Sequence, residues 1–112
     1  MTLSAQRHDK VLVLRPAGAR LDAAGAVAFK EAVAARIAAG DTRLVLDLGG
    51  VTFVDSSGLG ALVALLKRLG GQGQLVLAAV QPPVQRLLAL TRLDRVLAIR
   101  ETVKQACEAA GA

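Results

Sequence analysis

The sequence predicts an α/β fold in which a small mixed β-sheet of four to five strands packs against about four helices. Short, nearly all-apolar runs such as Leu44–Leu48 are typical of strands that are covered on both faces. Segments with apolar residues at helical spacing separate these runs, so most strands should pair in parallel through right-handed crossovers. Because the chain has 112 residues, we expect a single domain, residues 1–112.

An antiparallel hairpin is predicted at the start of the fold. The apolar run Val11–Leu14 stops at Arg15-Pro16, which is typical of a buried strand that ends in a turn. The polar segment Leu3–Arg7 lies before it, and we predict that the two strands connect through His8-Asp9.

The first helix is predicted between Asp22 and Gly40. Asp22 precedes an Ala-rich stretch and is expected to be its N-cap, while Gly40 is placed to end the helix as the C′ residue. The apolar positions that share one face of this helix are Ala26, Phe29, Val33 and Ile37.

Helices and strands continue to alternate in the second half of the chain. A second helix is predicted to begin at Ser56 and to stop near Gly70. A strand follows over Leu75–Ala79, and Pro83 is expected at the first position of a third helix. The last predicted elements are a short strand over Asp94–Ile99 and a helix over Thr102–Ala110.

Composition excludes several classes of protein. Cys107 is the single cysteine, so an intramolecular disulfide cannot form, and one His with one Cys cannot build a usual zinc site. No apolar run approaches the roughly 18 residues of a membrane helix, and the polar N-terminus lacks an apolar secretory core. We therefore expect a cytoplasmic protein with no metal, no cofactor and no membrane span.

The net charge of +5 raises nucleic acid or an anionic membrane as a partner. The basic residues are scattered along the chain, however, and only Phe29 and Phe53 are aromatic, so base stacking has little to use. We therefore expect no direct binding of nucleic acid.

The sequence carries no catalytic signature. A nucleophile elbow reads G-x-S-x-G, but Asp55 stands two residues before Ser57 and Val54 two residues before Ser56. The only histidine, His8, lies at the predicted hairpin turn, so a hydrolase that used either serine would lack a base. We expect no catalytic residues and no enzyme.

One polar constellation remains, the hexapeptide Asp55-Ser56-Ser57-Gly58-Leu59-Gly60 before an amphipathic helix. A carboxylate followed by two hydroxyls is good capping chemistry, since these oxygens accept the unpaired N–H groups of a first helical turn. Capping alone does not explain Gly58 and Gly60, because each glycine costs about 1 kcal/mol relative to Ala within a helix. Glycine there leaves a bare surface around the hydroxyls, which suits the close approach of another molecule.

At this hexapeptide the sequence resembles the STAS domain, in its anti-sigma factor antagonist branch. The letters D-S-S-G-L-G carry most of the specificity, and the match extends in order from about Val11 to Ala110. The segments that support it by order and spacing are Gly18–Asp22, Leu44–Leu48 and Leu93–Val96.

The resemblance implies a bacterial regulator that works by phosphorylation-dependent partner switching. In the family, the serine before the glycine, which corresponds here to Ser57, is phosphorylated by an anti-sigma factor that is also an ATP-dependent serine kinase. The unphosphorylated protein binds that anti-sigma factor and releases a sigma factor, and a metal-dependent serine phosphatase resets the phosphorylated form. The partner-binding residues that the resemblance implies are Asp22, Asp55, Ser56, Ser57, Gly58, Leu59 and Gly60.

Alternatives stay open for the function and for single residues. Some STAS proteins are accessory subunits of membrane transporters or lipid-trafficking ATPases, a role that the basic charge mildly favours, whereas the intact Ser57 favours partner switching. Asp22 and Asp55 are also explained as helix N-caps. Self-association into a homodimer is open as well.

Overall fold

A computed structural model describes residues 3–112 and confirms the predicted α/β fold. Within these residues the main sheet has five strands in the order β1-β2-β4-β6-β7, with an antiparallel β1–β2 pair and parallel pairs elsewhere. The five strands are β1 (Leu3–His8), β2 (Val11–Pro16), β4 (Arg43–Asp47), β6 (Gln74–Ala78) and β7 (Ala98–Arg100).

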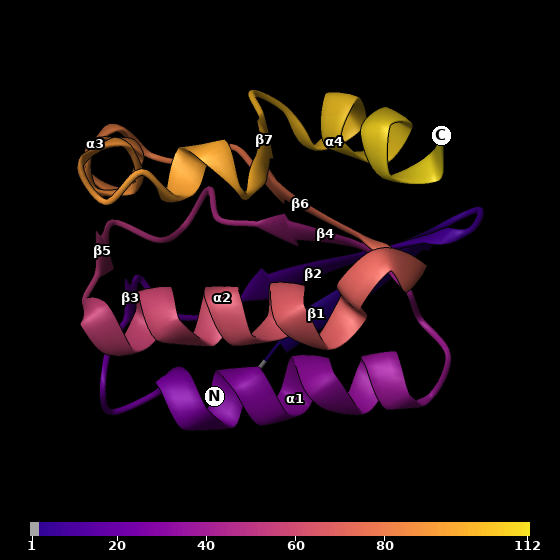
Figure 1. The fold of residues 1–112 in the computed structure, drawn as a ribbon, viewed down its shortest axis with the longest axis horizontal. Helices are drawn as coiled ribbons and strands as arrows, with labels where there is room; N and C mark the ends of the chain where they lie inside the picture. Colours follow the sequence, from indigo (N-terminus) through magenta and orange to yellow (C-terminus); the bar gives the residue numbers. More distant parts are fainter. Residues whose placement is uncertain (1–2) are drawn as a thin grey trace.

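Helices cover both faces of this sheet. Within residues 3–112 they are α1 (Ala26–Ala38), α2 (Ser56–Leu69), α3 (Pro82–Leu90) and α4 (Val103–Gly111). Helices α1 and α2 lie side by side on one face, and α4 packs on the other (Figure 1). None of the helices in this part of the chain combines the length and the apolar character that a membrane crossing requires.

The sheet separates two cores because the side chains of its strands alternate between the faces. Leucines of β2, β4 and β6 pack with Phe29 of α1, Leu62 of α2 and Leu88 of α3. Valines of the same strands pack with Ala106 and Ala110 of α4. Both faces of β4 and β6 are therefore buried, which explains their nearly uninterrupted apolar sequences.

The predicted hairpin is confirmed, with a change in its turn. His8 pairs with Val11, so the loop consists of Asp9 and Lys10 rather than His8 and Asp9. Asp9 has a φ of 54°, the left-handed conformation that tight hairpin turns require.

Asp22 is not the N-cap of α1, and the prediction was wrong here. The N–H groups of Gly25 and Ala26 donate to the Asp22 backbone carbonyl, which forms a turn, and the helix begins only after Gly25. The Asp22 carboxylate accepts a hydrogen bond from Arg20 instead. At the other end of α1, Gly40 has a φ of 108° and is the predicted C′ residue.

The segment between α3 and α4 differs most from the prediction. The expected strand Asp94–Ile99 begins as a one-turn 3₁₀ helix, Leu93–Arg95, and β7 follows it two residues further on. Arg92, with a φ of 60°, redirects the chain at this point because it adopts a left-handed conformation. In α3 itself, Pro82 rather than Pro83 takes the first helical position.

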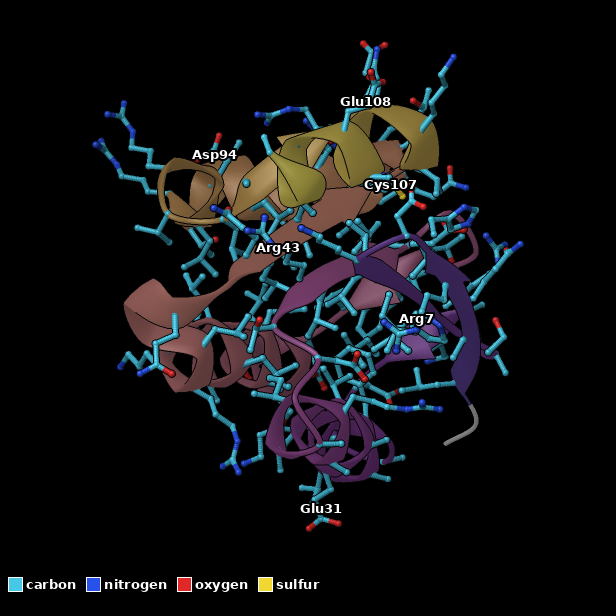
Figure 2. The ribbon with its side chains drawn as sticks, turned by 90° about the vertical axis from the view of Figure 1, so that its right-hand side faces the viewer. Arg7, Glu31, Arg43, Asp94, Cys107 and Glu108 are labelled. Carbon is cyan, nitrogen blue, oxygen red and sulfur yellow. The ribbon has the colours of Figure 1, made fainter. Side chains whose placement is uncertain are left out.

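The C-terminal end of α4 is attached to the sheet by Arg43, a residue of β4 (Figure 2). Its Nη1 atom donates to the backbone carbonyls of Ala110 at 2.9 Å and Ala112 at 3.0 Å. A positive charge is favourable at this position, because the last carbonyls of a helix lack partners within the helix.

Candidate functional site

A two-stranded parallel ladder brings two distant segments of the chain together. In this ladder β3 (Arg20–Leu21) pairs with β5 (Phe53–Val54). Just after β5, the Asp55 N–H donates to the Leu21 carbonyl at 3.3 Å. The loop that leads from β3 into α1 therefore lies beside the start of α2.

Asp55 is the N-cap of α2 and joins these two segments. One carboxylate oxygen accepts from the Gly58 N–H at 3.0 Å, and the other accepts from the Ala23 N–H at 3.1 Å. The hydrogen bond from Gly58 is the main cause that holds the pKa of Asp55 below its ordinary value of 3.8. Burial acts in the opposite direction and raises this pKa, whereas the hydrogen bond from Ala23 lowers it further. Asp55 is therefore ionised at neutral pH, and its capping role is confirmed.

Ser56 and Ser57 occupy the first two positions of α2, and both are exposed. The cap predicted from the hexapeptide is thus formed by the Asp55 carboxylate rather than by the serine hydroxyls. Ser57 belongs to the first turn of α2, where unpaired backbone N–H groups and the helix dipole create positive partial charge. Negative charge is favourable at such a position.

The two glycines of the hexapeptide have different roles. A Cβ atom on Gly58 would lie 2.2 Å from the Leu21 carbonyl oxygen and 2.8 Å from Val54 Cγ1. Gly58 is buried, so its missing side chain serves the packing of α2 on β3, not the approach of another molecule as expected. Gly60 is exposed, and a Cβ atom there would meet nothing within 4 Å. The predicted bare surface is therefore at Gly60.

The remaining residues predicted for partner binding are Asp22 and Leu59. Asp22 Oδ2 accepts from Arg20 Nε at 3.0 Å, and the guanidinium of Arg20 lies 4.1 Å from the centroid of the Phe53 ring. Leu59 is half-buried and packs against the larger core. The β3–β5 ladder thus brings Asp22 and the hexapeptide to one end of the molecule, while Leu59 contributes mainly to the interior.

Sequence reasoning missed a hollow between α1 and α2 beside Ser57. Its volume is about 170 Å³, and its lining residues are Ala23, Ala26, Val27, Lys30, Ser57, Gly60 and Ala61. Val27 is 61% exposed, which makes it an apolar residue of α1 that the core does not use. Val27 and Lys30 lie one turn apart in α1, which was an available signal, but only the packing of α1 on α2 brings them beside Ser57.

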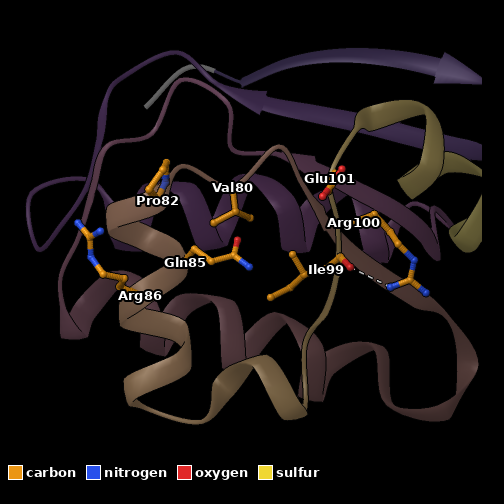
Figure 3. Close-up of a pocket in the computed structure, with 7 residues that line it drawn as sticks. All are labelled: Val80, Pro82, Gln85, Arg86, Ile99, Arg100 and Glu101. Atoms are coloured by element: carbon orange, nitrogen blue, oxygen red, sulfur yellow. Dashed lines mark hydrogen bonds between the residues drawn. The ribbon is translucent and has the colours of Figure 1, made fainter.

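A larger hollow of about 520 Å³ lies at the ends of β6 and β7, beside α3 (Figure 3). The side chains of Arg86 and Arg100 point to opposite sides of it, and Arg100 Nη1 donates to the Ile99 carbonyl at 2.9 Å. The charged groups therefore do not converge on one ligand. Across residues 3–112, no group of three or more His, Cys, Asp and Glu side chains is placed to hold a metal ion.

Comparison with known protein families identifies the family of this chain. The sequence model of the STAS domain matches residues 2–106, nearly the whole chain. The chain belongs to the STAS-domain family. Among its relatives, the anti-sigma-F factor antagonist RsfB of Mycobacterium tuberculosis is 30% identical over 106 residues, which cover 95% of this chain and 86% of RsfB.

Solved structures share the fold of this STAS domain. An anti-sigma factor antagonist from Mycobacterium paratuberculosis superposes with a TM-score of 0.90 at 31% identity, covering 99% of this chain and 94% of that one. The murine anion transporter Slc26a9 superposes with a TM-score of 0.78 at 22% identity, covering 95% of this chain but 18% of the transporter. The second likeness shows the fold alone, whereas the first agrees with the resemblance carried by the D-S-S-G-L-G hexapeptide.

Proposed function

We propose that this STAS domain is an anti-sigma factor antagonist that exchanges partners when Ser57 is phosphorylated. The observation that carries the proposal is the exposed Ser57 at a helix start capped by Asp55, in a chain that is 30% identical to RsfB. The unphosphorylated form binds an anti-sigma factor that is also a serine kinase, and so releases a sigma factor. A metal-dependent serine phosphatase restores that form. The role is regulatory rather than catalytic and is exercised in the bacterial cytoplasm.

The start of α2 can accommodate the phosphate. ATP transfers its γ-phosphoryl group to Ser57 Oγ, and ADP and the hydroxyl proton are released. The phosphate carries a charge of about −1.5 to −2 and lies close to the positive end of the helix dipole. The Asp55 oxygens already accept from Gly58 and Ala23, so the scaffold needs no new contacts to hold its shape.

A docked partner is affected far more than the fold. Where it contacted a small hydroxyl, it would meet a bulky dianion next to the Asp55 carboxylate. A loss of about 3 to 4 kcal/mol at the interface weakens binding roughly 100- to 1,000-fold, since each 1.4 kcal/mol is a factor of ten. This loss is sufficient to exchange partners without refolding.

Phosphorylation is tested with ATP and the anti-sigma factor kinases encoded near the gene for this protein. We expect intact-mass analysis and peptide mapping to find one phosphate on Ser57. Ser57→Ala should abolish it, whereas the matched Ser56→Ala variant, altered at the adjacent exposed hydroxyl, should retain it. Phosphate on another residue, or no phosphate with any of these kinases, would refute the assignment of Ser57.

Binding and stability are then measured on Ser57→Asp. Isothermal titration calorimetry with the same anti-sigma factors should show at least a roughly 100-fold loss of affinity. Thermal unfolding should show a stability within about 1 kcal/mol of the parent, because the substitution is at the surface. A large loss of stability with the affinity retained would contradict the proposal.

The role of transporter subunit has less support. The likeness to Slc26a9, at 22% identity, concerns the fold and not the partner. A stable complex with a transporter ATPase, formed without any phosphorylation of Ser57, would select that role instead.

A further inference from the structure

The hollow beside Ser57 has the chemistry of a site for one anionic group. Ser57 lines it from α2 and Lys30 lines it from α1. Among the residues that the structure describes, Lys30 is the only cation or carboxylate in the lining, and the members besides Ser57 are small or apolar: Ala23, Ala26, Val27, Gly60 and Ala61. An anion attached to Ser57 would therefore meet one cation and no competing carboxylate within the hollow.

Gly60 keeps this hollow open. It stands one helical turn after Ser57, it lines the hollow, and a Cβ atom built on it would point into open space. Glycine at such a helical position costs about 1 kcal/mol relative to Ala, and the packing of the protein does not require it here. The free space between Ser57 and Lys30 is what this residue provides.

Lys30 is available for such an anion. The ion pairs within residues 3–112 are Arg7–Asp41, Arg15–Asp47 and Arg20–Asp22, and none of them includes Lys30. The neighbouring Glu31 points into solvent in Figure 2; it lines the next hollow along the α1–α2 groove, which Lys30 also lines together with Lys67 and Arg68, and not the hollow at Ser57. Asp55, the carboxylate nearest to Ser57 in the sequence, is held by two backbone N–H groups.

We propose that Lys30 binds the phosphate of phosphorylated Ser57 within the same chain, across the hollow between α1 and α2. This inference rests on the proposed function only in that phosphorylation of Ser57 gives it a role in the cell. In the phosphorylated protein, the phosphate occupies the hollow and also pairs with the charge of Lys30. A partner that uses this surface then loses both the open hollow and the free cation.

The experiment reads the phosphate directly, without a kinase or a partner. Phosphoserine is placed at position 57 during translation, and the second ionisation of its phosphate is followed by ³¹P NMR titration in the parent and in Lys30→Gln. Because an exposed ion pair contributes a fraction of a kcal/mol up to about 1, Lys30→Gln should raise the pKa of the phosphate by about 0.2 to 0.7 unit. Added salt should reduce that difference.

Lys67→Gln is the matched control, because Lys67 lines the next hollow along the α1–α2 groove and not the one at Ser57. It should leave the pKa of the phosphate unchanged. An unchanged pKa in Lys30→Gln, or an equal rise in both variants, would overturn the proposal. If phosphorylation failed to weaken partner binding while Lys30→Gln still raised the pKa, the proposed function would fail and the phosphate site would stand.

Discussion

Substituting the two glycines at the start of α2 by alanine should have opposite effects on stability. At Gly58 the new methyl group would be 2.2 Å from the Leu21 carbonyl oxygen and 2.8 Å from Val54 Cγ1. The Leu21 carbonyl cannot move freely, because it accepts the Asp55 N–H and belongs to the β3–β5 ladder. At Gly60 the same methyl group meets nothing within 4 Å.

The magnitudes follow from these contacts. Overpacking in a closed site costs about 1 to 3 kcal/mol, and the shortest contact here is with backbone, so the cost at Gly58 should be near the upper end. Replacing Gly by Ala in a helix recovers up to about 1 kcal/mol, which leaves Gly58→Ala roughly 2 kcal/mol less stable than the parent. Gly60→Ala obtains the same propensity gain without the clash, and should be up to about 1 kcal/mol more stable.

Urea unfolding followed by far-UV circular dichroism measures both variants. With a denaturant dependence of about 1 to 3 kcal/mol per molar urea, the midpoint of Gly58→Ala should fall by roughly 1 M while that of Gly60→Ala rises by a few tenths. Midpoints that move in the same direction, or a Gly58→Ala variant as stable as the parent, would show that α2 does not pack on β3 as described.

Two further predictions concern the contacts that hold the helices. Arg43→Gln should lower the free energy of unfolding by about 1 kcal/mol and speed amide hydrogen exchange in α4, because Arg43 donates to two carbonyls at the end of that helix. The control is Lys104→Gln, an exposed substitution within α4, which should change neither the stability nor the exchange. Asp55→Asn should melt at a lower temperature than the parent at neutral pH, because the Asp55 pKa is lower in the fold than its ordinary 3.8. The ionised carboxylate stabilises the fold at pH values above 3.8, and this stabilisation is lost as the pH falls through the lowered pKa. The melting temperatures of the parent and of Asp55→Asn should therefore converge in acid. A difference between them that stays constant across pH would count against the cap.

Patterns that are local in sequence predicted most of the fold. The run Leu44–Leu48 is apolar except at Asp47, because helices cover both faces of β4 and bury Leu44 and Leu46 on one face and Val45 on the other. The start of α2 was predictable for a similar reason, since the Asp55 carboxylate accepts a hydrogen bond from an N–H group only three residues away. Asp22 shows where such reasoning stops. A carboxylate before an Ala-rich stretch has the pattern of a cap, but a backbone turn intervenes and Arg20 binds the carboxylate.

The features that depend on contact between distant segments could not be predicted in this way. The sequence does not reveal that the Leu21 carbonyl lies against Gly58. It therefore predicts that this glycine admits another molecule, whereas in the structure it admits β3. Lys30 was unremarked for the same reason, because its position beside Ser57 depends on how α1 packs on α2. The hexapeptide identified Ser57 as a candidate for phosphorylation, and the packing of α1 on α2 placed Lys30 in the same hollow.

The groups that hold α2 in place are distinct from those that a phosphate would alter. Asp55 and Gly58 face inward or toward backbone N–H groups, and their contacts with Ala23 and Leu21 form without any phosphate. Ser57 lies at the same helix start but is exposed and lines the hollow between α1 and α2. A dianion there changes the charge and shape of the surface, while the contacts between α2 and β3 remain as they are. A switch that worked by refolding would have to break those contacts, and it would appear as a loss of stability in Ser57→Asp. Affinity for the partner is therefore the quantity that phosphorylation should change.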